Sequence, residues 1–174
     1  VPSTISKLNI PDIPKGTINP TTLGMVLGAL IPENAIVVDE SVTTGREFFY
    51  QTAGSHPHTW LNNCGGSIGF GMPVAIGAAI SCPDRKVISL ECDGSAMYTV
   101  QSLWTMAREN LDIVVLIFAN QSYKILQGEL TNVGVVNPGK SAMEMLSLQD
   151  PSLDWVSLSK GMGVDAVRVD NLED

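Results

Sequence analysis

The chain has 174 residues, 44% of them hydrophobic and 16% charged, values typical of one globular domain that buries a core without disulfides or structural metals. Eighteen Asp and Glu residues against ten Lys and Arg residues give a net charge of −8, and with no basic run this argues against a nucleic-acid or anionic-membrane partner. Three cysteines are too few for a disulfide framework, and no apolar stretch reaches the roughly 18–20 residues of a membrane span, so we expect a cytoplasmic protein.

The N-terminal part predicts a linker, a helix, a strand and a short helix. Residues 1–16 contain three prolines and little periodicity, which favours a linker from a preceding domain, and we place the domain itself at 17–174, truncated at its C-terminus. Asn19-Pro20 is typical of a helix start. The spacing of four apolar residues predicts the buried face of this helix, which ends at Pro32: Leu23, Val26, Leu27 and Leu30. The apolar run 35–40 predicts a buried strand, and a short helix follows around 44–50.

Helices and strands continue to alternate through the rest of the chain. A Gly-rich segment, 62–73, leads into a helix of small residues at 74–81, and the apolar runs 86–93 and 113–120 predict two more buried strands. The remaining predicted elements are an amphipathic helix with Met97, Val100, Leu103, Trp104 and Ala107 on one face, a helix after Ser122, a loop at 136–139, a helix near 155–162 and a strand near 166–169. This alternation predicts the α/β class, with a parallel sheet sandwiched by helices.

Polar and small residues follow three of the predicted strands, at 39–44, 92–95 and 120–123. Because the carboxyl ends of parallel strands meet at one edge of a sheet, these clusters are expected to lie together, where α/β proteins bind ligands. A lone Asp93-Gly94-Ser95 is more often a turn with an N-capping serine. The recurrence of Asn120 at an equivalent strand end favours a site for a diphosphate and Mg²⁺, which prefers few protein oxygen ligands plus phosphate.

These residues resemble the cofactor signature of thiamine-diphosphate-dependent enzymes of the acetolactate synthase, benzoylformate decarboxylase and pyruvate oxidase group. The signature, Gly-Asp-Gly-Ser followed downstream by Asn-Asn, corresponds here to Cys92-Asp93-Gly94-Ser95 and Ala119-Asn120, with 27 positions between Asp93 and Asn120. Residues 65–78 are similar to the family's Gly-Gly-x-x-Gly-Phe stretch, and 39–43 to its diphosphate-contacting segment. The resemblance covers roughly 20–170 and implies the C-terminal pyrophosphate-binding domain of a three-domain chain.

The resemblance implies thiamine diphosphate and Mg²⁺ as cofactors. The implied metal ligands are Asp93, the Asn120 side chain and the Ser122 carbonyl. The implied cofactor-binding residues are Val42, Thr43, Gly66, Ser67, Ile68, Cys92, Asp93, Gly94, Ser95, Asn120, Ser122, Tyr123, Lys124 and Ile125. Among them, Thr43, Gly94 and Ser95 would hold the diphosphate, and Ile68 would support the bent shape of the cofactor.

The family carries out decarboxylation or carboligation of 2-oxo acids, so a small 2-oxo acid is the implied substrate. Its cofactor-activating glutamate lies on a pyrimidine-binding domain of the same or another subunit. We therefore expect that domain as a partner, a homodimer or homotetramer, and no activity from this domain alone. No catalytic residue is assigned here, because Glu40 and Glu91 are better explained as strand-end residues.

Two residues depart from the family pattern. Cys92 replaces the first glycine of the signature, and Ala119 replaces its first asparagine. A small buried filler explains Cys92 better than a reactive thiol does. Two alternatives to a fragment of a larger enzyme chain stay open: a free-standing β subunit of a two-chain 2-oxo acid decarboxylase, and a non-catalytic α/β binding domain that has lost the cofactor.

Overall fold

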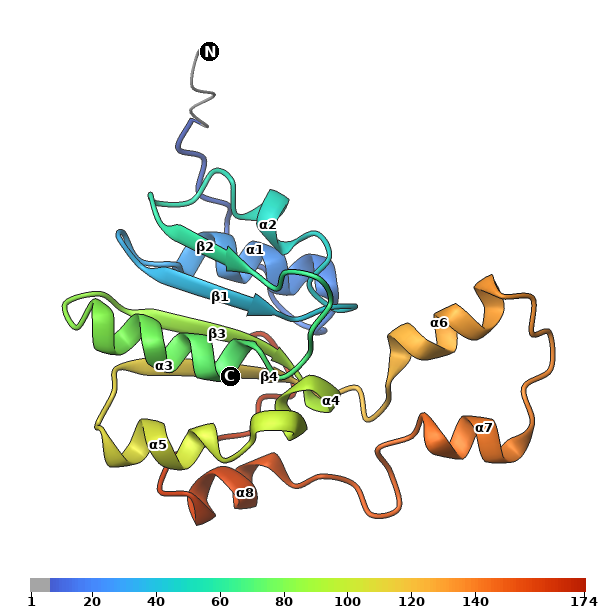
Figure 1. Ribbon diagram of the computed structural model, residues 1–174. Coiled ribbons are helices and arrows are strands. Elements are labelled where there is room, and N and C mark those ends of the chain that lie inside the picture. The colour runs from blue at the N-terminus through green and yellow to red at the C-terminus, as the bar shows by residue number, and fades with distance from the viewer. Residues whose placement is uncertain (1–6) are drawn as a thin grey trace.

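The computed structural model describes residues 7–174, and it contains a parallel sheet with helices on both faces (Figure 1). The four strands are β1 (Ile36–Glu40), β2 (Thr59–Asn62), β3 (Val87–Cys92) and β4 (Ile113–Phe118), and their spatial order is β2-β1-β3-β4. All neighbouring pairs are parallel. The predicted α/β class is thus confirmed. Residues 1–6 of the predicted linker lie outside the described residues, and the domain boundary stays a prediction.

The helices pack on the sheet in two layers. One layer consists of α1 (Pro20–Leu30) and α2 (Phe48–Gln51), and the other of α3 (Gly71–Ser81), α5 (Ser102–Arg108) and α8 (Trp155–Gly161). The shorter or more peripheral elements are α4 (Asp93–Ala96), a 3₁₀ turn over Met97–Thr99, α6 (Lys124–Asn132) and α7 (Lys140–Met145). Each layer has its own hydrophobic core against the sheet.

Strand β3 lies at the centre of the sheet, between β1 and β4, and all six of its residues are buried. Its side chains alternate between the two cores, since Val87 packs with the α3 layer whereas Ile88 and Leu90 pack with α1. A buried central strand of this kind gives the loops at its end a fixed position.

Helix α1 begins as predicted, and its buried face is shifted from the predicted one: Leu23 and Leu27 pack in the core, whereas Leu30 does not. Asn19 accepts a hydrogen bond from the Thr22 N–H and caps the helix, and Pro20 is its first residue. Of the four predicted face residues only Leu27 is buried, whereas Leu30 is 59% exposed. Gly24 and Gly28 are buried instead, because they let α1 approach Gln51 of α2: a Cβ on Gly24 would lie 1.5 Å from Gln51 Oε1.

Two other predicted segments differ from the structure. No strand forms near 166–169, where the backbone pairs with no other described strand and Val167 is 85% exposed. The predicted amphipathic helix across 97–107 is divided into the 3₁₀ turn and α5, and the short helix α4 precedes them. Trp104 is 52% exposed, and the Arg108 guanidinium lies 4.8 Å from its ring centre. Helical structure thus already begins at Asp93, directly after β3.

Three elements escaped sequence-based prediction or shifted. Strand β2 was not predicted, because it has only four residues and both of its ends are polar and exposed, so it lacks the apolar run of a buried strand. Helix α7 was not predicted either, and α2 begins at Phe48, later than the expected start near 44. Strand β4 forms as predicted, but it is only partly buried, because β3 is its single neighbour in the described part of the sheet. No helix of the described residues is long and apolar enough to cross a membrane.

The strand order makes the chain change direction between β1 and β3. From β1 the chain adds β2 on one side of the sheet, and then returns to add β3 and β4 on the other side. The loops that leave the carboxyl ends of β1 and β3 therefore diverge and leave space between them, and this is the position where open α/β sheets bind ligands.

Candidate functional site

The three predicted loops meet at the carboxyl edge of the sheet. Glu40 and Glu91 are paired in register near the ends of β1 and β3, and Cys92 is paired with Phe118 at the end of β4. The segments that follow these strands contain the predicted residues: Val42–Thr43 in a loop, Asp93–Ser95 in α4, and Asn120–Ile125 in a loop that runs into α6. The predicted common edge is thus confirmed, while the roles of the individual residues there stay predictions.

Asp93 joins two of these loops. Its side chain is almost fully buried; Oδ1 accepts the Gly94 N–H at 3.0 Å, and Oδ2 accepts the Gln121 N–H at 2.6 Å. Burial raises the pKa of this carboxyl, while the two backbone N–H groups act in the opposite direction. The carboxylate therefore lies directly against the loop that contains Asn120.

The loop after β4 is a tight turn that presents oxygen atoms. Asn120 is exposed, and its Oδ1 accepts the Ser122 N–H at 3.0 Å. Gln121 has a φ of 57°, in the left-handed region that few non-glycine residues adopt. Among the described residues no donor contacts the Ser122 carbonyl oxygen, so this oxygen remains available as a ligand.

The loop after β1 has a strained backbone. Val42 has a φ of 42°, which is unfavourable for a β-branched residue and is retained only where the surroundings enforce it. Before it, Ser41 is fully buried, and both its N–H and its hydroxyl donate to Asp39 Oδ1, at 3.0 and 2.5 Å. These bonds fix the path of the chain into Val42 and Thr43.

A small cavity of about 40 Å³ lies between these loops. Its lining residues are Val42, Thr43, Ile68, Cys92, Gly94, Ser95, Asn120, Ser122, Tyr123, Lys124 and Ile125. All of them belong to the predicted cofactor-binding set. The other members lie nearby or outside: Asp93 is buried behind the wall, and Gly66 and Ser67 are exposed on the loop before α3.

Gly94 is required by the close approach of Tyr123. A Cβ at position 94 would lie 2.6 Å from Cε1 and 2.8 Å from Cδ1 of the Tyr123 ring. Burial raises the pKa of the Tyr123 hydroxyl, so the ring remains a neutral wall of the cavity.

Cys92 has the character of a buried filler. It is 8% exposed, its Sγ lies 2.7 Å from the Ser41 carbonyl oxygen, and burial raises the pKa of its thiol to about 11. The thiol is therefore protonated and a poor nucleophile at neutral pH.

The two glutamates beside the site, Glu40 and Glu91, are more deeply buried than the sequence predicts for strand-end residues. Glu40 is 1% exposed and Glu91 is fully buried. Burial raises the pKa of Glu91 to about 9, against the opposing effect of the Ser89 hydroxyl, and the neighbouring charge of Glu40 raises it further. An acidic residue in each of two strands that are otherwise buried was the available signal.

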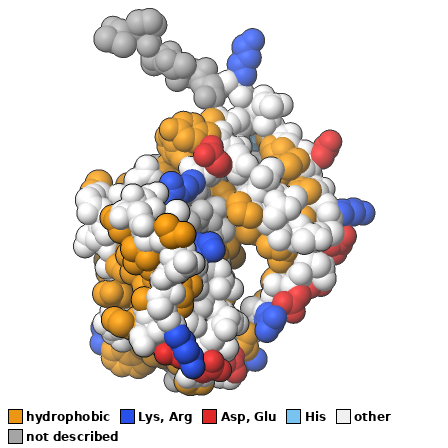
Figure 2. All heavy atoms as spheres, turned by 90° about the vertical axis from the view of Figure 1, so that its right-hand side faces the viewer, with side chains coloured by type: hydrophobic (Ala, Val, Ile, Leu, Met, Phe, Trp, Pro, Cys, Tyr) orange, Lys and Arg blue, Asp and Glu red, His pale blue; other side chains and the backbone are white. Residues whose placement is uncertain are grey.

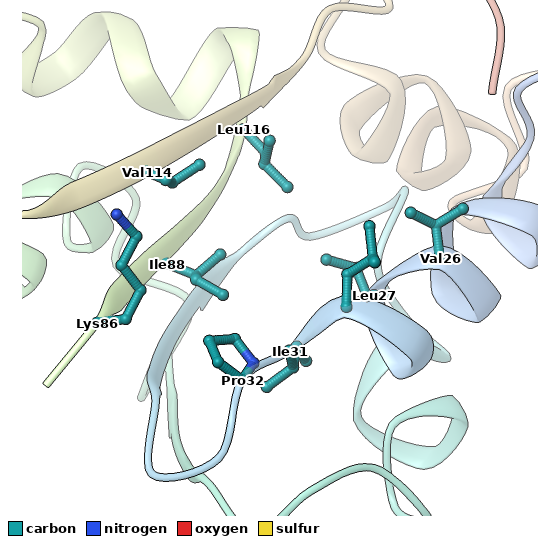
Figure 3. Close-up of a pocket in the computed structure, with 9 residues that line it drawn as sticks. Val26, Leu27, Ile31, Pro32, Lys86, Ile88, Val114 and Leu116 are labelled. Atoms are coloured by element: carbon teal, nitrogen blue, oxygen red, sulfur yellow. The ribbon is translucent and has the colours of Figure 1, made fainter. Parts of the chain in front are cut away.

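A larger apolar groove of about 360 Å³ lies elsewhere, on the α1 side of β3 and β4 (Figure 3). Its lining residues are Val26, Leu27, Leu30, Ile31, Pro32, Lys86, Ile88, Val114 and Leu116. Lys86 is the one ionisable residue among these, so the groove lacks the groups that acid–base or metal chemistry needs. The smaller cavity is the better candidate for a functional site.

The donor set at the smaller cavity fits a hard divalent cation that also binds phosphate. Asp93, Asn120 and the Ser122 carbonyl offer oxygen only, with a single carboxylate. No group of three or more His, Cys, Asp or Glu residues in the described part of the chain is arranged to hold a metal by itself. Ligand oxygens from elsewhere would thus have to complete the coordination shell.

Comparisons with known proteins show the family to which the chain belongs. The family model "Thiamine pyrophosphate enzyme, C-terminal TPP binding domain" matches residues 44–174. The chain is 48% identical over 165 residues to the Mycobacterium tuberculosis protein named "Putative acetolactate synthase large subunit IlvX", which covers 94% of this chain and 32% of the relative. It is 32% identical over 160 residues to benzoylformate decarboxylase of Pseudomonas aeruginosa, covering 91% of this chain and 29% of the relative.

A solved structure of a thiamine diphosphate-dependent enzyme has a similar fold over nearly the whole of this chain. The thiamine diphosphate-dependent 4-hydroxybenzoylformate decarboxylase of Rhodococcus jostii RHA1 superposes with a TM-score of 0.77 at 28% identity, covering 97% of this chain and 31% of that chain. In each of these comparisons the chain spans about a third of the relative's length.

Proposed function

This chain belongs to the thiamine pyrophosphate (TPP, thiamine diphosphate) enzymes as one of their C-terminal TPP-binding domains, and from that membership we propose that it binds the diphosphate end of TPP with Mg²⁺ between the ends of β1 and β3. The observation that carries the proposal is the bond from the Gln121 N–H to Asp93, which brings the oxygen ligands of two loops together. In this proposal Asp93, Asn120 and Ser122 ligate Mg²⁺.

The other lining residues would bind and orient the organic part of the cofactor. Thr43, Gly94 and Ser95 surround the space for the diphosphate, and Ile68 and Ile125 supply apolar walls. Gly94 packs against the Tyr123 ring, and both residues line the cavity. A cavity of about 40 Å³ is too small for a whole cofactor, which supports a site that another domain completes.

The activity we propose is decarboxylation or carboligation of a small 2-oxo acid by the complete enzyme. Bound TPP supplies the carbanion chemistry of such reactions. The residues of this chain anchor and orient the cofactor, and the glutamate that activates it would come from a pyrimidine-binding domain. This division of labour predicts that the domain alone is inactive.

An exposed arm next to the site supports such a partner. The arm comprises residues 121–148 with α6 and α7, stands apart from the sheet in Figure 1, and has no buried residue in either helix. Val133, Val136 and Met145 are 74%, 87% and 80% exposed. Figure 2, which looks at the molecule from the right-hand side of Figure 1, shows patches of hydrophobic side chains on this side, with charged side chains between them and along the lower edge. Exposed apolar groups of this kind are typical of interaction surfaces.

The arm is tied to the site at its base. Ser122 and Ser147 form an antiparallel bridge, in which the Tyr123 N–H donates to the Leu146 carbonyl and the Leu148 N–H to the Gln121 carbonyl. We infer that a pyrimidine-binding domain of the same or a second subunit covers the arm, in a homodimer or homotetramer.

The three cysteines are free thiols, which supports a reducing compartment such as the cytoplasm.

Calorimetric titration of the full-length protein with TPP tests the proposal. Wild type should bind TPP only with Mg²⁺ present, and Asp93→Ala should weaken binding by at least about 100-fold, because it removes a ligand, whereas changes to groups around the ligands cost about 10- to 100-fold. Asp112→Ala, at the opposite edge of the sheet, is the matched control and should bind as wild type does. Metal-independent binding, or an unchanged Asp93→Ala, would contradict the proposal. A panel of 2-oxo acids then tests for release of carbon dioxide.

A further inference from the structure

Glu40, the last residue of β1, caps the N-terminus of helix α3. Its Oε2 accepts the Gly71 N–H at 2.9 Å and its Oε1 accepts the Phe70 N–H at 3.0 Å. The helix has no side-chain cap of its own, because Phe70 stands at the N-cap position. A buried carboxylate thirty residues earlier in the chain thus satisfies the first free N–H groups of an eleven-residue helix.

The same carboxylate is linked to the loop before the helix. Asn63, directly after β2, donates through Nδ2 to Glu40 Oε1 at 3.4 Å and to the Ser67 carbonyl at 3.0 Å. The hydroxyl of Thr99 donates to the Gly69 carbonyl at 3.2 Å from the far side. The path of residues 67–71 is therefore set by Glu40, Asn63 and Thr99.

The earlier part of this loop has little support of its own. Gly65 and Gly66 have φ values of 72° and 68°, and a Cβ on either residue would have no neighbour within 4 Å. The space beside both glycines is thus open on the side where a Cβ would lie, and the hydrogen-bonded anchors of the loop come later, at residues 67–71.

Glu91 fills the space beneath the helix start. A Cβ on Gly71 would lie 2.1 Å from Glu91 Oε1, so only glycine lets the helix end approach this carboxyl group. The Ser89 hydroxyl donates to Oε1 at 2.6 Å, whereas Oε2 has no partner. Glu91 lies beside Glu40 in the sheet register, so the two buried carboxyl groups stand together beneath the start of α3.

We propose that Glu40 is a positioning residue that, with Asn63, sets the loop of Gly66, Ser67 and Ile68 for the aminopyrimidine half of TPP. The inference rests on the proposed function, since that loop is where the cofactor's organic half would lie. The diphosphate half would be held independently, by the Asp93 side of the site.

The experiment compares two ligands on the full-length protein, TPP and inorganic pyrophosphate, each with Mg²⁺. Glu40→Gln keeps the size of the side chain but turns an amide N–H₂ toward one of the two backbone N–H groups. We expect TPP affinity to fall about tenfold, as for one lost charge-assisted hydrogen bond, while pyrophosphate affinity remains that of wild type. Amides of residues 66–71 should also exchange hydrogen faster in this variant.

Asn63→Ala is the second variant, for the event that Glu40→Gln does not fold, and it should give the same separation between the two ligands. Glu109→Gln, the same substitution at an exposed position, is the control. Equal loss of both ligands, or no loss of TPP affinity with unchanged exchange at 66–71, would overturn the positioning role. Failure of the wild-type protein to bind either ligand would instead overturn the proposed function, so the two failures are distinct.

Discussion

The carboxylate of Asp93 accepts the backbone N–H of Gln121 at 2.6 Å, across the ends of β3 and β4. This bond connects two loops that are far apart in the sequence and lie at one edge of the sheet. It gives Asp93 a structural role that can be measured without any cofactor.

Asp93→Ala should therefore destabilise the protein even in the absence of ligand. The Gly94 and Gln121 N–H groups lose their acceptor, and we expect the free energy of unfolding to fall by about 1–3 kcal/mol. Urea denaturation measures this loss. Asp112→Ala, which removes an exposed ion pair with Lys86, should change stability by less than about 1 kcal/mol. Equal effects of the two substitutions would refute this account of Asp93.

Gly94→Ala should overpack the contact with Tyr123. The added methyl group overlaps the ring edge at 2.6 Å, and we expect a loss of about 1–3 kcal/mol together with weaker TPP binding. The double variant Gly94→Ala, Tyr123→Ala should recover part of the stability, because the overlap is gone. A double-mutant cycle checks this coupling, and strict additivity of the two substitutions would show that the contact is unimportant.

Glu91 should make the protein less stable as the pH rises. Its pKa is raised from 4.5 to about 9 by burial, so between these values the folded protein holds a proton that the unfolded chain has released. Raising the pH then favours unfolding, with a slope that approaches about 1.4 kcal/mol per pH unit within this window. The stability that protonated Glu91 contributes is complete below pH 4.5, and it is lost as the pH rises through about 9.

Glu91→Gln should flatten that dependence, because the amide does not titrate. Denaturation curves from about pH 5 to about pH 9 for wild type, Glu91→Gln and the exposed control Glu109→Gln measure the difference. Parallel pH profiles for wild type and Glu91→Gln would exclude Glu91 as the source.

Substitutions on the arm should separate assembly from folding. Val136→Asp and Met145→Asp alter side chains that are mostly exposed, so the free energy of unfolding of the isolated domain should change by less than about 0.5 kcal/mol. Sedimentation velocity of the full-length protein should show weaker self-association. Asp165→Asn, on an exposed residue outside the arm, is the control. Unchanged association of both arm variants would leave this surface without the proposed role.

Sequence patterns were sufficient for the elements whose signal is local. The apolar runs of β1, β3 and β4 and the Asn19-Pro20 helix start needed no tertiary information. The polar loops after three strands likewise indicated a common edge, because parallel strands leave no other arrangement.

Features that depend on distant partners could not be predicted in this way. The buried face of α1 is set by Gln51, which Gly24 approaches, and the cap of α3 comes from Glu40. A strand such as β2, with polar residues at both ends, exists because β1 offers it hydrogen bonds. The segment 166–169 has an apolar pattern but finds no strand partner among the described residues.

The partial burial of β4 has a practical consequence for handling the domain. Within the described residues its outer edge offers unpaired N–H and C=O groups beside Val114, which is 40% exposed. Such an edge accepts another strand, so concentrated samples of these residues alone are expected to aggregate edge to edge. A lysine at position 114 would interrupt that pairing without touching the carboxyl edge, and would make the domain easier to crystallise or to study by NMR.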